Sequence, residues 1–304
     1  MSARPGRPPV RARREARAGL AFVAPALTLI ALFFVVPVVA GFLLAATDFD
    51  IYGIGDFTTA RFVGLGNFAA LLHDPVFWKA LGNTFYFVLV GGPLSVGVSL
   101  GAAMLVNARL VRFKGFFRTV YFAPVVTTMA AVAVVWRYLY HPRFGLANQL
   151  LAAVGLPDVN WLGDPRWAMP AIILMAIWKN FGYNMIIFVA GLQGIPTTLY
   201  EAARVDGAGP WQQFRHITLP ALRPMLVFVG IITMIGYFQI FTEPYVLTGG
   251  TGGPLNATLS LVMYMYKQGF RWWNIGFAAA VALVLFLIIL AGTLVQMRLQ
   301  RERS

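Results

Sequence analysis

Residues 18–47 carry no charged side chain, and few folds can accommodate a stretch of this kind. About 20 apolar residues in a row are enough to cross the hydrocarbon core of a bilayer as a helix. The whole chain is 59% hydrophobic and 12% charged, whereas a soluble domain carries about 25% charged residues. We therefore predict an all-α membrane protein that contacts the lipid bilayer. Its six transmembrane helices are expected at about residues 18–47, 80–108, 119–140, 167–192, 217–243 and 272–297.

The net charge of +13 would suggest a nucleic-acid partner in a soluble protein, but the placement of the charges indicates a membrane orientation and no nucleic acid. Six arginines and a single acid, Glu15, lie in residues 1–17, which is typical of a basic cytoplasmic tail. A cleavable signal peptide is the alternative, but its apolar core should be only about 7–15 residues long. With both termini in the cytoplasm, including a short tail at 299–304, sixteen Lys and Arg residues lie inside and seven outside.

A polar segment between the fourth and fifth spans has the sequence EAARVDGAGPWQQFRHITLP and covers residues 201–220. Its first residues favour a helix. Gly207, Gly209 and Pro210 then interrupt that helix, because Gly costs entropy in a helix and Pro is accommodated in the first turn of the next one. We therefore expect a cytoplasmic helix–hinge–helix coupling loop over residues 198–216, lying across the membrane surface as a rigid unit.

This segment resembles the signature loop of the membrane-spanning permease subunits of ABC importers. The pattern is Glu-Ala-Ala, three residues, Gly, nine residues and Ile-x-Leu-Pro, and the sequence matches every fixed position. The carbohydrate-importer, maltose-type branch is indicated by Gly191-Leu192-Gln193, Ile195-Pro196, Leu199-Tyr200 and Pro224. An ordinary surface loop is the alternative.

The resemblance implies the type I ABC importer permease fold over residues 18–298, with the loop docked in a cleft of a separate ATPase. The residues implied in this coupling are Glu201, Ala202, Ala203, Asp206, Gly207, Ile217, Leu219 and Pro220. We expect Glu201→Ala and Gly207→Asp to leave the protein inserted but to uncouple ATP hydrolysis from uptake.

The resemblance also implies the partners of the chain. These are a second permease subunit that completes a heterodimer, two copies of an ABC ATPase, and an extracytoplasmic solute-binding protein. ATP and Mg²⁺ belong to the ATPase, and this chain is expected to bind no cofactor and no metal. The assembly would lie in the bacterial cytoplasmic (inner) membrane and work by alternating access, in which ATP closes the ATPase pair and the spans rock from inward-open to outward-open.

The sequence contains no motif for catalysis. Each of its four lysines follows an aromatic residue, so a glycine-rich phosphate loop that ends in Gly-Lys is absent. The three histidines are scattered, and the lack of cysteine excludes disulfides and thiol chemistry. We predict a transport subunit and not an enzyme.

Ion-coupled transport is the main rival interpretation. Carriers driven by protons or sodium usually keep acids or histidines deep within their spans. Here the spans hold one acid, Glu243 at the outer end of the fifth, and one deep charge, Lys179. Lys179 could contact an anionic group or a partner helix, but we expect a structural or lipid-edge position, with the side chain extended along the span.

Polar and aromatic side chains midway along the fourth and fifth spans are the candidates for contact with solute. Asn180 and Tyr183 are three residues apart, Thr233 and Tyr237 are four apart, and Gln239 lies nearby. Aromatic faces stack on sugar rings, and amides hydrogen-bond to hydroxyls. By resemblance, the first four fall where maltose-type relatives line their translocation site. Bonding between neighbouring helices is the alternative role.

The glycine-rich outer segment 248–254 is expected, by resemblance, to face the solute-binding protein through Thr248, Gly249, Gly250 and Pro254, with a simple cluster of turns as the alternative. The complete interpretation is a permease subunit of an ATP-driven importer for a sugar or sugar derivative. The alternatives are the same machinery for glycerol phosphate or another small solute, a secondary carrier without an ATPase, and a membrane scaffold without transport.

Overall fold

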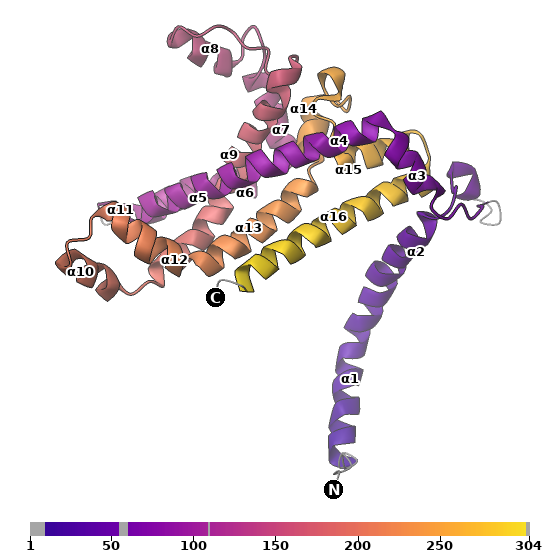
Figure 1. Ribbon diagram of the computed structural model, residues 1–304, viewed down its shortest axis with the longest axis horizontal. Helices are drawn as coiled ribbons and strands as arrows, with labels where there is room; N and C mark the ends of the chain where they lie inside the picture. Colours follow the sequence, from indigo (N-terminus) through magenta and orange to yellow (C-terminus); the bar gives the residue numbers. More distant parts are fainter. Residues whose placement is uncertain (1–9, 55–59, 109, 302–304) are drawn as a thin grey trace.

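The computed structural model of the chain describes residues 10–54, 60–108 and 110–301 (Figure 1). Four helical segments in these residues are long and apolar enough to cross a bilayer: Ala18–Leu44, Pro75–Asn107, Pro165–Gln193 and Ile275–Leu299. Two bent pairs bring the number to six when each pair is one span: Lys114–Val126 with Met129–Leu139, and Pro210–Ala221 with Arg223–Phe238. Within the described residues, extended pairing is limited to one bridge between Thr47 and Phe62. The protein is an all-α membrane protein, as predicted.

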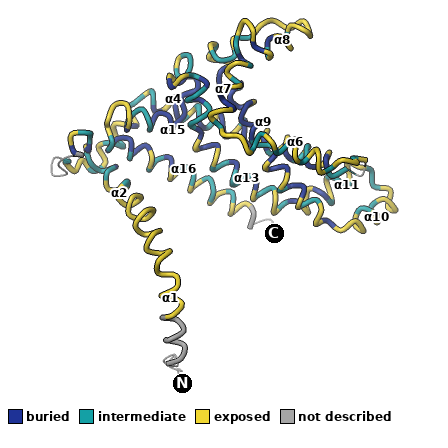
Figure 2. Tube along the Cα trace, turned by 180° about the vertical axis from the view of Figure 1, so that it is seen from behind, coloured by how far each residue is buried: buried dark blue, intermediate teal, exposed yellow. Residues whose placement is uncertain are grey.

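The N-terminal part of the first span stands apart from the rest of the molecule, whereas its C-terminal part contacts the last span, Ile275–Arg301 (Figure 1, Figure 2). The first span runs from α1 (Val10–Ile30) through a π-helical turn (Ala31–Val35) into α2 (Val36–Leu44). Its apolar side chains are exposed along most of its length. Such a helix suits contact with lipid or with another subunit. Residues 1–9 and 302–304 of the expected cytoplasmic tails lie outside the described residues.

The second span is continuous and starts earlier than the sequence analysis expected. It consists of α4 (Pro75–Tyr86), a π-helical turn (Phe87–Gly91) and α5 (Gly92–Asn107). The Asp74 carboxylate accepts a hydrogen bond from the backbone N–H of Val76 at 2.7 Å. An N-cap aspartate followed by Pro is a strong helix start. The remaining short elements that connect the spans are 3₁₀ turns at Ile51–Ile54 and Pro254–Asn256, α3 (Gly66–His73), α8 (Leu146–Ala153), α15 (Leu261–Tyr266) and a π-helical turn at Lys267–Arg271.

The third span is bent, where a single uninterrupted helix was expected over residues 119–140. α6 (Lys114–Val126) and α7 (Met129–Leu139) meet at 97°. Thr127 and Thr128 between them have extended backbones, with ψ of 149° and 141°. The Thr127 hydroxyl donates to the carbonyl oxygen of Pro124 at 2.6 Å. This side-chain bond competes with continuation of the helix.

The fourth span, α9 (Pro165–Gln193), is the central helix and packs most extensively on α5 and α6. Asp164 caps its start by accepting from the N–H of Arg166 at 2.8 Å. Hydrogen bonds from Arg166 hold the pKa of the Asp164 carboxyl below its ordinary value. α6 approaches α9 closely at Gly182, where a Cβ atom would lie 2.0 Å from the carbonyl oxygen of Tyr121.

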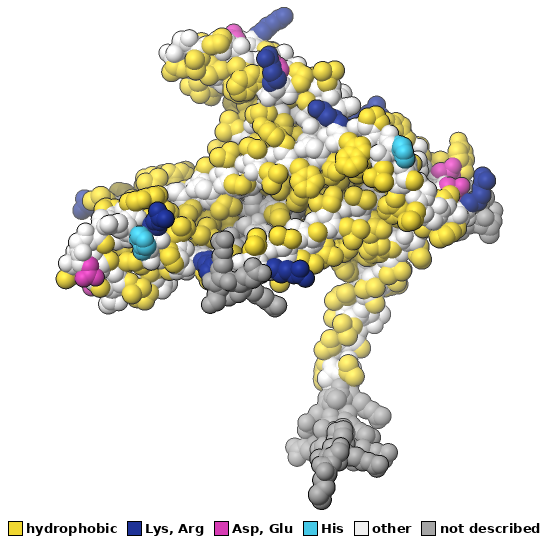
Figure 3. All heavy atoms as spheres, viewed as in Figure 1, with side chains coloured by type: hydrophobic (Ala, Val, Ile, Leu, Met, Phe, Trp, Pro, Cys, Tyr) yellow, Lys and Arg dark blue, Asp and Glu magenta, His cyan; other side chains and the backbone are white. Residues whose placement is uncertain are grey.

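The fifth span begins later than expected, at α13 (Arg223–Phe238), because the preceding helical stretch is bent away from it by 67°. Pro224 lacks the N–H that would continue the helical bonds across this point. A separate short helix, α14 (Thr242–Leu247), then holds Glu243. The last span is α16 (Ile275–Arg301). On the face in Figure 3, hydrophobic side chains cover the middle of the molecule, and Lys and Arg lie mostly near its edges.

Candidate functional site

The segment between α9 and α13 forms a helix–turn–helix at one end of the molecule (Figure 1). Its first helix, α10 (Thr197–Val205), ends before Gly207, whose φ of +78° lies in the left-handed region that favours glycine. The N–H of Gly207 donates to the carbonyl of Arg204 at 3.1 Å, and the N–H of Ala208 to that of Ala203 at 2.8 Å. This is the Schellman arrangement that closes helices. The turn is therefore fixed by backbone hydrogen bonds.

The second half of this segment is tied back to the first. α11 (Pro210–Gln213) continues through a π-helical turn (Phe214–Thr218) into α12, Leu219–Ala221. The hydroxyl groups of Tyr200 and Thr218 are 2.9 Å apart and hydrogen-bonded. We call residues 197–221 the elbow. Its internal bonds make it a compact unit and not a loose loop.

All of the predicted ATPase-coupling residues belong to the elbow. Six of these residues are exposed, namely Glu201, Ala202, Asp206, Gly207, Leu219 and Pro220. Ala203, Asp206, Gly207 and Ile217 line a shallow groove on its surface. The structure thus gathers these side chains on one segment, and their contact with an ATPase stays a prediction.

Two large apolar side chains also project from the elbow, and the sequence analysis named neither. Val205 is 88% exposed and Trp211 is 69% exposed. The Trp211 ring packs against Phe214, with ring centroids 5.4 Å apart. Exposed aromatic and apolar side chains are typical of docking surfaces. A large aromatic residue, Trp211, in the most polar long segment of this half of the chain was the signal that the sequence held.

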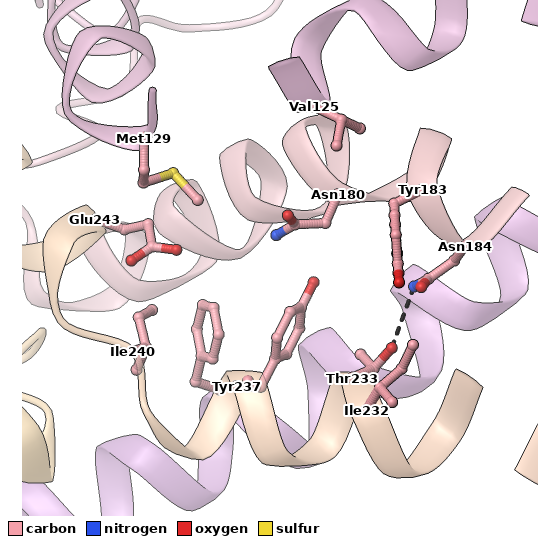
Figure 4. Close-up of a pocket in the computed structure, with 12 residues that line it drawn as sticks. Val125, Met129, Asn180, Tyr183, Asn184, Ile232, Thr233, Tyr237, Ile240 and Glu243 are labelled. Carbon is pink, nitrogen blue, oxygen red and sulfur yellow. Dashed lines mark hydrogen bonds between the residues drawn. The ribbon is translucent and has the colours of Figure 1, made fainter. Parts of the chain in front are cut away.

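A cavity of about 380 Å³ lies between α9 and α13, where α6 ends and α7 and α14 begin (Figure 4). This volume lies within the usual range for small-molecule sites, about 300–1,000 Å³. Its polar lining consists of Asn180, Tyr183, Asn184, Thr233, Tyr237 and Glu243. Its apolar lining consists of Phe87, Val125, Met129, Ile232 and Ile240. The Asn184 amide donates to the Thr233 hydroxyl at 3.1 Å and so links the two walls.

Four of the five predicted solute-path residues therefore lie on one cavity, namely Asn180, Tyr183, Thr233 and Tyr237. Gln239 does not line it, because this residue follows the last turn of α13 and is exposed. The role of all five in binding solute stays a prediction.

The side chain of Tyr237 lines the cavity, and its hydroxyl group lacks a hydrogen bond within the described chain. Its ring packs on Phe87, with centroids 4.7 Å apart. Within the described part of the chain, the buried hydroxyl makes no hydrogen bond of acceptable geometry, although Ser95 and Asn180 lie near it. A buried polar group without a partner is destabilising. The hydroxyl is therefore a candidate to bond a polar group of a solute, and this role stays a prediction.

The sequence analysis missed two polar residues of the lining. Asn184 lies four residues after Asn180, and this spacing places both on one face of a helix. That signal was present in the sequence. Glu243 was assigned to the end of a continuous fifth span, but α14 is a separate helix that packs on α7 and α9 and brings Glu243 to the cavity.

Lys179 lies inside the helix bundle, which corrects the lipid-edge alternative and supports the structural one. The residue is 6% exposed, and its Nζ donates to the carbonyl oxygen of Val125 at 3.0 Å. Val125 lies in the last turn of α6, whose carbonyls lack partners further along the helix. A cation at this end also interacts favourably with the helix dipole. Lys179 thus caps the broken third span.

The outer segment 248–254 is ordered by its own hydrogen bonds. The Thr248 hydroxyl donates to the carbonyl oxygen of Pro244 at 2.6 Å. Gly249 is exposed, Gly250 is buried, and Pro254 is half-buried at the start of a 3₁₀ turn. Contact between this segment and a solute-binding protein stays a prediction.

Within the described residues, no group of three or more His, Cys, Asp or Glu side chains is arranged to hold a metal ion. Two ion pairs among the described residues lie near the connections between spans. They join Arg61 to Asp48 at 3.6 Å and Arg166 to Asp164 at 2.9 Å. The functional candidates are therefore the elbow and the cavity.

Comparison with known proteins bears on both. Residues 94–304 match the family described as "Binding-protein-dependent transport system inner membrane component". The lactose transport system permease protein LacF of Rhizobium radiobacter is 38% identical over 289 residues, which cover 94% of this chain and 95% of that protein. The arabinooligosaccharides transport system permease protein AraP of Bacillus subtilis is 35% identical over 279 residues, covering 91% of this chain and 87% of that protein.

A solved structure has the same fold. It is the crystal structure of a bacterial alginate ABC transporter in complex with an alginate pentasaccharide-bound periplasmic protein. One of its chains matches with a TM-score of 0.80 at 22% identity, and the match covers 96% of each chain. The type I importer permease fold expected from the sequence is confirmed.

Proposed function

Since the chain belongs to the family of binding-protein-dependent transport system inner membrane components, and is an ABC importer permease subunit and not an enzyme, we propose that it forms half of the path by which a sugar or sugar derivative enters a bacterial cell. The lactose and arabinooligosaccharide systems of its relatives support a sugar as the solute. The cavity supports it chemically, because amides, hydroxyls and aromatic rings suit a hydroxyl-rich ring.

The observation that carries this proposal is the continuity between the elbow and the cavity. α9, which bears Asn180 and Tyr183, leads into the elbow through only Gly194, Ile195 and Pro196. α13, which bears Thr233 and Tyr237, follows the elbow after Leu222 alone. The elbow is therefore the connection between the two opposite walls of the cavity. A displacement of the elbow is transmitted to both walls.

In the proposed mechanism the elbow docks on an ATPase subunit in the cytoplasm. Two ATPases bind ATP and Mg²⁺, and this chain binds neither. Closure of the ATPase pair moves the elbow, and the two walls of the cavity then change from an inward-open to an outward-open arrangement. The compact turn at Gly207 suits this role because a rigid connection transmits motion without absorbing it.

A second permease subunit completes the path, and an extracytoplasmic solute-binding protein delivers the solute. The pair is proposed to be a heterodimer in the bacterial cytoplasmic membrane, with both termini of this chain in the cytoplasm. The outer segment 248–254 is proposed to face the binding protein. The excess of Lys and Arg in the cytoplasmic connections supports this orientation.

Reconstituted uptake tests the function. We expect accumulation of sugar in proteoliposomes only when the second permease subunit, the ATPase and the solute-binding protein are present and ATP is supplied. An ATPase variant that binds but does not hydrolyse ATP is the control and should abolish uptake. Transport by vesicles that hold this polypeptide alone would contradict the proposal.

The orientation has its own test, because the natural chain contains no cysteine. A membrane-impermeant maleimide applied to intact cells should leave Val205→Cys unlabelled and should label Leu255→Cys. These positions are matched, since their side chains are 88% and 83% exposed. Labelling of Val205→Cys from outside would place the elbow on the wrong side of the membrane.

A further inference from the structure

A second pocket, of about 520 Å³, lies where the elbow meets the ends of α5 and α9. Figure 1 shows α11 beside the end of α5 at that end of the molecule. We call it the elbow pocket. It shares no lining residue with the cavity, and its polar lining consists of Asn107, Gln193, Thr197, Tyr200, Arg204 and Gln213. A molecule bound there would contact both halves of the elbow and the ends of two spans.

The elbow pocket is positively charged. Arg204 is the one charged side chain among the described residues that line it. The Nε of Arg204 donates to a backbone carbonyl of its own helix at 3.1 Å, which leaves the two terminal nitrogens for a ligand. A second cation lies beside the pocket, because the Nζ of Lys114 donates to the carbonyl oxygen of Asn107 at 3.0 Å. The two acids of the elbow, Glu201 and Asp206, do not line the pocket. Its charge therefore suits an anion.

Uncharged donors accompany this cation. The side chains of Asn107, Gln193 and Thr197 carry two amides and a hydroxyl, and none of these groups has a hydrogen bond within the described chain. Gln213 is fixed instead, since its amide nitrogen donates to the carbonyl oxygen of Ala208 at 2.8 Å. A guanidinium group with further donors around it matches a phosphate group, whose oxygens accept several hydrogen bonds.

The size of the elbow pocket indicates a phosphate ester and not a bare phosphate ion. Leu192 and Ile195 add an apolar part to the lining, which suits an organic group attached to the phosphate. Asn107 and Gln193 are the last residues of two spans. Basic pockets between membrane helices on the cytoplasmic side can bind lipid head groups. The head group of an anionic phospholipid and a soluble phosphate ester therefore share the chemistry that fits this pocket.

We propose that the elbow pocket is a binding site for a phosphate ester, with Arg204 as its charged contact, and that the bound ester ties the elbow to the ends of α5 and α9. A ligand at this joint would act on the connection through which the elbow moves the walls of the cavity. The site is separate from the solute path, so the inference goes beyond the proposed function and does not depend on which solute is carried.

Protection of an introduced cysteine tests the site, because the natural chain contains none. Thr197→Cys and Thr198→Cys are a matched pair, since both positions are exposed and only Thr197 lines the pocket. The complete importer, in a maltoside detergent without phosphate, is labelled with a maleimide in the presence of glycerol phosphate or of short-chain phosphatidylglycerol. With a probe at about ten times its dissociation constant, labelling of Thr197→Cys should slow about tenfold. Labelling of Thr198→Cys should not change.

The two probes distinguish the sources of the phosphate. Protection by glycerol phosphate as well as by phosphatidylglycerol would show that soluble esters occupy the site, and protection by phosphatidylglycerol alone would assign it to a lipid head group. Glycerol, which lacks the phosphate, should not protect. Short-chain phosphatidylcholine should protect less than phosphatidylglycerol, because its choline cation offsets the phosphate charge.

Arg204→Gln, introduced together with Thr197→Cys, should raise the dissociation constant of the protecting probe about tenfold or more. Arg215→Gln is the matched control, because Arg215 is an exposed arginine of the same elbow that does not line the pocket. It should leave the constant unchanged. Gln193→Leu removes one uncharged donor without touching the elbow helices, and it should raise the constant about threefold.

An unchanged labelling rate of Thr197→Cys with both probes would overturn the inference and leave the proposed function intact, because sugar uptake in the proposed mechanism does not need this ligand. Equal weakening by Arg204→Gln and Arg215→Gln would also overturn it, since the general charge of the elbow would then attract the probe. Absence of ATP-dependent sugar uptake would count against the proposed function and would not alter the protection of Thr197→Cys.

Discussion

The elbow and the cavity are built in opposite ways. The elbow is one continuous segment, and its bond between Tyr200 and Thr218 joins residues only 18 positions apart. The cavity is assembled from distant segments, with the Lys179–Val125 bond spanning 54 positions and Asn184–Thr233 spanning 49. The elbow exposes its key side chains, whereas the walls of the cavity are mostly packed. Substitutions in the elbow should thus change coupling and spare the fold, but those behind the cavity should change both.

Glu201→Ala should give the largest effect and should act on coupling alone. Glu201 is exposed in the described chain, and docking on an ATPase would bury its charge. Loss of one member of a buried charged contact costs about 2–5 kcal/mol at an interface. We expect normal insertion and thermal stability, with ATP hydrolysis no longer linked to uptake in proteoliposomes.

The matched control is Asp158→Ala, which removes an exposed acid from the connection between the third and fourth spans and should leave uptake unchanged. Normal solute accumulation by Glu201→Ala would break the distinction between elbow and cavity, since the exposed carboxylate would then have no coupling role.

Gly182→Ala should act in the opposite manner, through the fold. The added Cβ would lie 2.0 Å from the carbonyl oxygen of Tyr121, and a backbone atom cannot move aside as a side chain can. Overpacking of this kind typically costs about 1–3 kcal/mol. We expect lower thermal stability of the detergent-purified subunit and displacement of α6 from α9.

Gly97→Ala provides the comparison, because a Cβ at that position meets nothing within 4 Å in the described chain. Alanine also favours a helix more than glycine. Equal loss of stability in the two variants would show that glycine content, and not the close approach at Gly182, sets the stability.

The same contrast explains what the sequence could predict. α9 begins at Pro165 after the N-cap Asp164, start signals that act within a few residues, and the sequence analysis began the fourth span only two residues later, at about residue 167. The elbow was predicted because its turn depends on Gly207 and its immediate neighbours. The break at Thr127 was not predicted, since the lysine that caps α6 comes from position 179, and hydropathy continues through the break.

Glu243 was missed for the same reason. Its neighbours predicted the end of a span, and only the packing of α14 on α7 and α9 brings it to the cavity. Asn180, Tyr183, Thr233 and Tyr237 were found because helical spacing groups each pair locally. That the two pairs face each other follows from contacts between distant segments.

Gly207→Asp should weaken coupling by less than Glu201→Ala. A residue with a Cβ in the left-handed region costs roughly 1–2 kcal/mol, although Asp and Asn tolerate it better than most. Apart from the neighbouring residues, the described chain places no atom within 4 Å of the added Cβ, so the cost comes from the backbone and from the new charge. We expect partial uncoupling, measured as uptake per ATP hydrolysed.

Gly207→Asn has the same shape without the charge and separates the two causes. Coupling that is lost in Asp but kept in Asn would assign the effect to charge at the docking surface. Wild-type coupling in both variants would show that the turn at Gly207 transmits no motion.

Tyr237→Phe should give the smallest effect and should sharpen the comparison from the side of the cavity. The substitution keeps the ring against Phe87 and removes only the hydroxyl, which makes no good hydrogen bond within the described chain. Stability should therefore stay the same or rise slightly. If the hydroxyl binds a solute group, affinity should fall by about 0.5–1.5 kcal/mol, or up to about tenfold.

Tyr140→Phe is the matched control, because the buried Tyr140 hydroxyl donates to the carbonyl oxygen of Ala171 at 2.8 Å. That variant should lose stability and keep its affinity for maltotriose, measured in nanodiscs, whereas Tyr237→Phe should do the reverse. A loss of stability in Tyr237→Phe without a loss of affinity would assign its hydroxyl to packing. The opposite result would mean that an unsatisfied group, held by the fold at a cost in stability, is kept for the solute.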